Sequence, residues 1–449
     1  MNMEAGRDSP GRRSGEQPGI LPVGLLWGIT TVLGVWYGFQ YAVSPERLFD
    51  YFAVGTAAFF AGLAALLVAA WRSRGAQVRE RTTAGVLLSA AAVLQGLYFF
   101  SKALPVSWIV VAAVVVVPAL ALVWWRAGLA LAWVGVAGLL AYWAIALLEP
   151  LDVAAANMLP IIQAACVDVA AGVNPYTKTY PDIATLPLYY FPGLWVPYCP
   201  FEWLHLDVRW LNVSLDLLVV VLLARACGAP GRWDLFGACV LPFLLSPPLL
   251  QMLIHGHLWP YWTMIALVLY LLTRARIAAA ASALAAGLGM RQLALFMVVP
   301  LSAAFLAGGP RTVIRRALLA AGVLAVLLLP AVAAVDSFVS HFFTSIANAN
   351  ATLNVHPGNP HDQIALSGLL PGGMRPALLQ ALQVLVAFAG FGAALWAGRG
   401  KPTPAALLIA GCAYLCAVGL NPFVNRYFYV PGIMVACVAL AHGVRAGTR

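Results

Sequence analysis

The chain has 449 residues, of which 62% are apolar and only 9% charged. A soluble globule of this length needs far more polar surface, so the composition excludes a water-soluble domain and favours a polytopic, all-α membrane protein. The net charge of +10 does not indicate nucleic-acid binding, because the basic residues form short clusters between apolar runs, as topology signals do.

Residues 1–18 are polar and lack signals for secondary structure, so we expect a disordered cytoplasmic tail. Runs of about 20 apolar residues, the length that crosses a bilayer, follow. Before residue 149 they occupy 20–43, 52–71, 84–102, 106–124 and 129–148. After residue 210 they occupy 211–225, 235–253, 258–273, 277–307, 317–335, 377–397, 403–420 and 428–444.

The run 277–307 is too long for one ordinary span and short for two. Arg274 precedes it and Arg311 follows it, so both of its ends are expected on the cytoplasmic side. We therefore expect two short helices that meet near Gly289, with Arg291 at the turn on the outer side. The chain then has about fourteen membrane segments, with both termini inside.

This assignment places nineteen of the 26 Lys and Arg residues on the cytoplasmic side, in agreement with the positive-inside rule. They are Arg7, Arg12, Arg13, Arg72, Arg74, Arg79, Arg81, Arg126, Arg225, Arg232, Arg274, Arg276, Arg311, Arg315, Arg316, Arg399, Lys401, Arg445 and Arg449. Most His, Asp and Glu residues fall on the other side. Reactive chemistry is therefore expected on the extracytoplasmic face.

Four polar pieces make up that face. Residues 149–210 form the longest segment that cannot cross a bilayer, with six carboxylates and five Tyr, and we expect a large loop with interfacial helices. The others are the turn at 255–257, the stretch 336–376 and the turn at 421–428. Within the first loop, Trp195, Tyr198, Trp203 and Trp210 are predicted to form an aromatic belt at the membrane interface.

Four motifs occur in a meaningful order on this face. They are GVNPY (172–176) with LYYFPGLWVPY (188–198) and Arg209; IHGHLWPYWTMIALVLYLLTRAR (254–276); ALAAGLGMRQLALFMVVP (283–300); and NPFVNRYFYVP (421–431). Together they resemble the bacterial polyprenyl-phosphate-sugar-dependent glycosyltransferases of the C-type (GT-C) membrane fold, in the mannosyltransferase-like group. The resemblance assigns 127–449 to a GT-C-like core and leaves 19–126 as additional N-terminal helices.

The resemblance implies an enzyme of the bacterial inner membrane that moves a mannose-like or pentose sugar from a polyprenyl phosphate to an extracytoplasmic lipid, glycan or protein, with inversion. Such a reaction needs a carboxylate to accept the proton of the acceptor hydroxyl, and cations to hold the departing phosphate. Arginines neutralise a phosphate without a metal ion. We therefore expect no cofactor, no obligatory divalent metal and no nucleic-acid partner.

Three carboxylates are candidates for the base. Asp152 comes first, because the family places an Asp just after its first core helix. Glu149 and Asp168 are alternatives, and Asp168 equally suits the polar face of an interfacial helix. The family often carries its Asp at a position where this chain has Asn157, which keeps open a short insertion, a different base or a non-catalytic relative.

The donor phosphate has five candidate ligands. Arg291 lies in an otherwise uncharged run, where an Arg is costly unless it has a partner, although snorkelling to lipid headgroups is the alternative. Arg426 and Tyr427 are expected to hold the same phosphate or to anchor a helix end. His255 and His257 are predicted to contact phosphate or sugar or to cap a helix, rather than to bind Zn, since no further ligands have suitable spacing.

The remaining candidates lie in the first loop. Asn174, Tyr176 and Lys178 are predicted to line the sugar or acceptor cleft, with ordinary turn chemistry as the alternative. Cys166 and Cys199 share this loop and are candidates for a disulfide.

Two other function classes stay open from the sequence. A lipid-linked glycan flippase or transporter needs a polar path across the bilayer, whereas the mid-span positions are nearly all apolar. A non-catalytic relative would bind a lipid-linked sugar without turnover.

Overall fold

The computed structural model describes residues 136, 139, 140, 142–144, 146–148, 151, 158–181, 183–188, 190–228, 247–332, 340, 344, 376–421 and 426–446. The predicted tail, the predicted N-terminal helices up to residue 126 and nearly all of the 336–376 stretch lie outside these residues. So do two of the three candidate bases, Glu149 and Asp152.

The described chain is predominantly helical. The first loop contains α6 (Met158–Ala170), η1 (Pro175–Thr177), β1 (Thr179–Tyr180), β2 (Ala184–Pro187), α7 (Pro192–Trp195), η2 (Val196–Tyr198) and α8 (Cys199–Trp203). The helices that follow are α9 (Arg209–Cys227), α12 (Pro247–His255), α13 (Trp259–Thr273), α14 (Ile277–Leu288), η3 (Gln292–Ala294), α15 (Leu295–Ser302) and η4 (Ala303–Phe305). The last are α16 (Pro310–Val332), α18 (Pro376–Gly398), α19 (Pro404–Gly419), η7 (Arg426–Tyr429) and α20 (Val430–Ala446).

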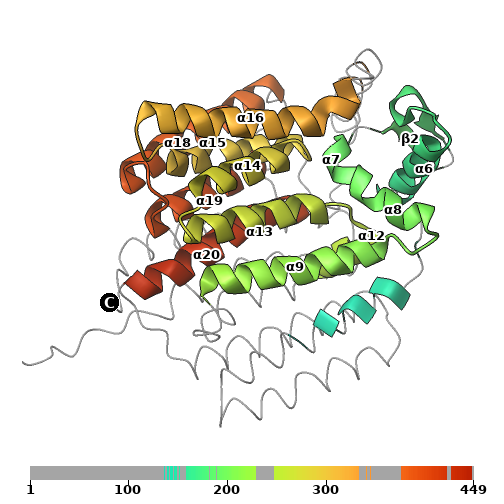
Figure 1. The fold of residues 1–449 in the computed structure, drawn as a ribbon, viewed down its shortest axis with the longest axis horizontal. Helices are drawn as coiled ribbons and strands as arrows, with labels where there is room; N and C mark the ends of the chain where they lie inside the picture. The colour runs from blue at the N-terminus through green and yellow to red at the C-terminus, as the bar shows by residue number, and fades with distance from the viewer. Residues whose placement is uncertain are drawn as a thin grey trace, which may run out of the picture.

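The long helices form a layered bundle with the first loop at one end. Figure 1 shows α6, α7 and α8 at one end of the bundle and the C-terminus at the other. The central helix is α13, which packs against α9, α14 and α20 and buries Trp259 and Trp262 completely. A second group of contacts joins α15, α18 and α19.

Within the described residues, three helices are long and apolar enough to cross a membrane, namely Arg209–Cys227 of α9, Pro310–Leu329 of α16 and Leu378–Gly398 of α18. None of the residues in the α16 span is buried, and Leu318, Val326 and Leu329 are exposed on it. An exposed apolar surface of this kind is unfavourable in water but favourable against lipid tails. The chain is therefore a helical membrane protein.

The predicted break in the run 277–307 is confirmed. The first helix of this run, α14, ends at Leu288, and α15 begins at Leu295. Arg291 lies between them in extended conformation, with φ −149° and ψ 129°. The two halves pack on different partners, α14 on α13 and α16, and α15 on α18 and α19. Neither is long enough to cross a bilayer alone, since twelve residues of helix span only about 18 Å.

The first loop folds into a compact unit, which we call the α6–α8 segment (residues 158–208). A disulfide joins Cys166 of α6 to Cys199 at the start of α8, so this candidate pairing is confirmed. Trp203 of α8 donates from its indole N–H to the carbonyl of Cys166, at 2.9 Å. The segment also contains a two-stranded antiparallel ribbon, β1–β2, which an all-α description did not anticipate.

The predicted aromatic belt is wrong for two of its four residues. Trp203 and Trp210 are 47% and 48% exposed, as interface residues would be. Trp195 and Tyr198 are instead buried, because each has a polar partner inside the protein. The Trp195 indole donates to the hydroxyl of Tyr176, and the Tyr198 hydroxyl donates to Asn212.

The disulfide should make a measurable contribution to stability. It closes a loop with a sequence separation of 33, for which chain entropy gives about 3 to 4 kcal/mol. We expect the double substitution Cys166→Ala/Cys199→Ala to lower the thermal unfolding midpoint of the purified protein. Reductant should lower the midpoint of the wild type but not that of the double variant. Cys416→Ala, which removes a cysteine with a free thiol, is the matched control. Failure of mass spectrometry to find a peptide pair linked through 166 and 199 without reductant would contradict the pairing.

Candidate functional site

The site is built around a short turn between α12 and α13 that carries His257. Gly256 allows this turn, because a Cβ there would lie 2.5 Å from the Sδ of Met252 and 2.7 Å from its carbonyl oxygen. Asn212 of α9 is fully buried and donates to the carbonyls of Leu253 at 3.0 Å and Gly256 at 2.9 Å. These bonds satisfy backbone carbonyl groups at the C-terminal end of α12 and fix the turn against α9.

His257 is almost completely buried, at 1% exposure, and its ring stacks on Tyr190 with 4.1 Å between centroids. Neither ring nitrogen has a hydrogen-bond partner among the described residues. Buried polar groups without partners cost free energy and are rare in folded proteins. Two such nitrogens on one side chain therefore indicate a position prepared for a ligand.

Arg291 is the second component of the site. It lies at the break between α14 and α15 and is 9% exposed. Its guanidinium lies over the ring of Phe428 in η7, 4.7 Å from the centroid, and its Nε has no hydrogen-bond partner in the described part of the chain. A cation–π contact of this kind contributes about 2 kcal/mol when desolvated, but it leaves the N–H donors free to bind an anion.

Two neighbouring groups hold this pair of residues in place. The Tyr414 hydroxyl of α19 donates to the carbonyl of Phe428, at 2.9 Å, and so fixes the ring under Arg291. On the other side, α7 approaches the α14–α15 break closely. A Cβ on Gly193 would lie 3.0 Å from Cγ of Met290 and 3.2 Å from the carbonyl oxygen of Gly289, so the glycine of the FPG sequence is needed for this contact.

A chain of contacts brings the four sequence motifs together. The Tyr176 hydroxyl of the NPY motif donates to the carbonyl of Tyr190, at 2.9 Å. Tyr190 packs against His257, with the two rings tilted by 41°, and α7 meets the α14–α15 break at Gly193, where a Cβ would lie 3.0 Å from Cγ of Met290. Arg291 in turn lies over Phe428 of the last motif. Segments that are far apart in the sequence thus meet at one place.

The electrostatics of this place favour an anion. Burial, and then the positive charge of Arg291, hold the pKa of His257 well below its usual range. The imidazole is therefore neutral at pH 7, and one ring nitrogen is a donor while the other is an acceptor. The site presents one permanent cation and one neutral, protonatable ring.

Comparison with family models, with curated proteins and with solved structures found no match. The residues themselves must carry the functional argument.

Asp168, Lys178 and Tyr180 form a separate cluster on the α6–α8 segment. Lys178 pairs with Asp168 at 2.5 Å, and the Tyr180 hydroxyl donates to the other carboxylate oxygen at 2.7 Å. Burial, and then the hydrogen bond and charge of Asp168, raise the pKa of Tyr180, so this hydroxyl keeps its proton. The Asp168 carboxylate is thereby neutralised by a cation and a donor.

The other predicted ligands have mixed surroundings. Asn174 caps η1 by accepting from the backbone N–H of Tyr176 at 3.0 Å, which is turn chemistry. His255 is the last residue of α12, and Arg426 is the first residue of η7. Tyr427 packs edge-on against Phe428, with 4.8 Å between centroids, and so borders the site.

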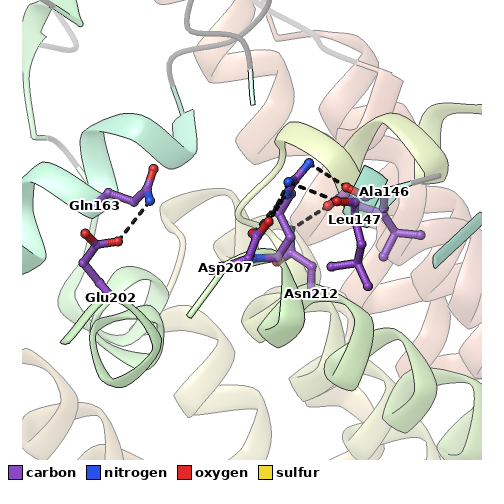
Figure 2. Close-up of polar contacts among 8 residues, drawn as sticks. Ala146, Leu147, Gln163, Glu202, Asp207 and Asn212 are labelled. Carbon is purple, nitrogen blue, oxygen red and sulfur yellow. Dashed lines mark hydrogen bonds and ion pairs between the residues drawn. The ribbon is translucent and has the colours of Figure 1, made fainter. Parts of the chain in front are cut away.

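Arg209, the arginine of the first motif, connects α9 to the helix before the loop. It pairs with Asp207 at 2.5 Å and donates to the carbonyls of Ala146 at 2.6 Å and Leu147 at 3.5 Å (Figure 2). These carbonyls belong to residues 146–148, which are helical. The guanidinium therefore joins the start of α9 to this described helical turn.

Sequence reasoning missed one buried acid. Asp216 lies inside α9 at 1% exposure and accepts from the indole N–H of Trp143 at 2.7 Å. The signal was a single carboxylate within an apolar run, in a segment where only apolar residues were expected. The described residues contain no group of three or more His, Cys, Asp or Glu side chains placed to share a metal ion.

The buried Asn212 should be critical for the turn that carries His257. Asn212→Ala removes two donors and leaves the Tyr198 hydroxyl without its acceptor, at an expected cost of about 2 to 4 kcal/mol. Tyr198→Phe, which removes only the single bond to Asn212, should cost about 1 kcal/mol. Thermal unfolding midpoints in one detergent would compare them. Equal effects of the two substitutions would contradict the role of Asn212.

Proposed function

We propose that this protein is an integral membrane glycosyltransferase that takes a sugar from a polyprenyl phosphate and transfers it to an acceptor outside the cytoplasm. The acceptor is a lipid, a glycan or a protein, and the sugar is mannose-like or a pentose. The observation that carries the proposal is the meeting of four motifs around Arg291 and His257, both buried and both with unpaired nitrogens.

A phosphate suits these two residues better than a neutral ligand does. An unneutralised guanidinium in a desolvated position binds phosphate oxygens through charge-assisted hydrogen bonds. The neutral ring of His257 adds one N–H donor to the same anion. In the transition state, negative charge builds on the leaving phosphate, so fixed donors at this position lower the barrier.

The reaction balances with one carboxylate and no metal. The acceptor oxygen forms a bond to C1 of the sugar, while the bond from C1 to the phosphate oxygen breaks and its electron pair stays on the phosphate. The proton of the acceptor hydroxyl passes to the base. Asp168 is a poor base because Lys178 and Tyr180 already hold it. We therefore assign the role to Asp152, with Glu149 as the second candidate.

The proposed orientation places the α6–α8 segment outside the cytoplasm. Two features support it. A disulfide between Cys166 and Cys199 persists in oxidising compartments and is rare in the cytoplasm. At the far ends of the helices, His442 of α20 contacts the carbonyl of Ala226 in α9 at 2.8 Å, beside Arg225, whose charge favours the cytoplasmic side.

The full proposal has about fourteen membrane segments in a GT-C-like bundle, with both termini in the cytoplasm of a bacterial cell. The core is 127–449, preceded by the additional helices 19–126 and the tail 1–18. The partners are the bilayer, the donor lipid and the acceptor.

The test is release of free polyprenyl phosphate. Purified protein in nanodiscs would be incubated with a panel of polyprenyl-phosphate sugars and a membrane lipid extract, and the products followed by mass spectrometry. We expect sugar-dependent release, lowered about 100- to 1,000-fold by Arg291→Gln through loss of one phosphate cation. Asp152→Asn should abolish release but preserve donor binding.

Arg315→Gln is the matched control, because it removes an exposed arginine near the start of α16 that belongs to none of the four motifs. It should leave the rate unchanged. Donor binding without release by the wild type would favour a non-catalytic relative. Movement of an intact lipid-linked sugar across the membrane of proteoliposomes, again without release, would favour a flippase.

A further inference from the structure

His257 has a feature that phosphate binding by Arg291 alone does not require. It is the more deeply buried of the two residues, and both of its ring nitrogens are unpaired within the described chain. A histidine that serves only to pack against Tyr190 would bond at least one nitrogen to a nearby carbonyl, as His442 does with Ala226. Both ring nitrogens of His257 are thus available to bind a ligand.

The charged surroundings of His257 are one-sided. The charge that acts on its ring is the positive charge of the Arg291 guanidinium. The acidic residues of the described part have partners elsewhere: Asp168 with Lys178, Glu202 with Gln163, Asp207 with Arg209 and Asp216 with Trp143. The other titratable groups around the site include the hydroxyls of Tyr190, Tyr261 and Tyr414, and a tyrosine hydroxyl keeps its proton at pH 7. Within the described residues, no acid lies beside ligand-free His257 to favour its protonation.

We propose that His257 takes up a proton from water when a phosphate monoester binds beside Arg291, so that the site gains a second positive charge only when the ligand brings a second negative one. This inference rests on the proposed function and deepens it. An incoming anion offsets the repulsion from Arg291 and replaces it with attraction, which reverses the electrostatic balance at the ring.

The charges of the proposed reaction explain why such a residue is useful. The donor is a phosphodiester with one negative charge, which Arg291 alone balances. When the bond to C1 breaks, the electron pair remains on the phosphate, and the product is a monoester with two negative charges. A neutral imidazole that becomes protonated at this point stabilises the departing group more than the bound donor. His257 would then be a catalytic residue, since it touches the leaving phosphate.

Binding affinity then depends on pH with a defined sign. In the free protein the imidazole is neutral, and in the complex it is protonated over a wider range. Affinity therefore rises as pH falls through that range, by up to about tenfold per pH unit for one linked proton. Above the range, the ring is neutral in both states and affinity is constant.

The experiment is calorimetric titration of the full-length protein with farnesyl phosphate, a short prenyl monoester, in two buffers of different ionisation enthalpy at pH 7.5. At this pH the free monoester is almost fully dianionic, since its second pKa is about 6, so any proton taken up comes to the protein. We expect uptake of more than half a proton by the wild type and almost none by His257→Asn. Farnesyl methyl phosphate, a diester with one charge, should cause clearly less uptake.

His205→Asn is the matched control, because His205 is exposed and has a positive φ of 53° that Asn tolerates well. It should behave as the wild type. The wild-type comparison of monoester with diester needs no variant, so misfolding of His257→Asn does not remove the test. Binding of farnesyl phosphate without proton uptake would overturn this inference and leave the proposed function standing. No binding of either ligand would overturn both.

Discussion

A buried guanidinium that lies on an aromatic ring, instead of on a carboxylate, is the interaction on which the rest of this structure depends. Arg291 has Phe428 beneath it, and desolvation of an arginine is costly without an acid or a ligand. The cation–π contact offsets only part of that cost. Most of the local architecture can be understood as a means of holding this cation in place while its donors remain free.

Three helices provide that support. The α19 hydroxyl of Tyr414 holds the backbone of Phe428, and the α9 amide of Asn212 holds the turn before α13. The close approach of α7 at Gly193 closes the break that carries Arg291. None of these contacts involves the reacting groups themselves. They fix the positions of Arg291 and His257, and such preorganisation is what the proposed electrostatic catalysis requires.

Much of this arrangement was accessible from the sequence. Apolar runs predict membrane helices because a span must satisfy its own backbone, and counting charges at both ends of 277–307 located the break at Arg291. The motif order placed Arg291 and His257 in one candidate set. The disulfide was a candidate because both cysteines lie in a segment that cannot cross the bilayer.

The remainder depended on packing, which spacing does not encode. The sequence predicts Trp195 and Tyr198 to be interface residues, yet each is buried and donates a hydrogen bond to a side chain inside the protein. Asn212 and Asp216 look like isolated polar residues in an apolar run, and only their partners, Gly256 and Trp143, explain them. Phe428 had no distinguishing signal, because nothing in the sequence indicates which aromatic residue lies under a given arginine.

The central claim is that the four motifs form one anion site around Arg291. The most direct measurement is photolabelling with a prenyl phosphate that carries its photoreactive group beside the phosphate, followed by mapping of the labelled peptides. The account predicts label on the peptides that contain His257 and either Arg291 or Phe428, and loss of that label with excess farnesyl phosphate. Label confined to the exposed faces of α16 and α18, and unaffected by the competitor, would contradict it.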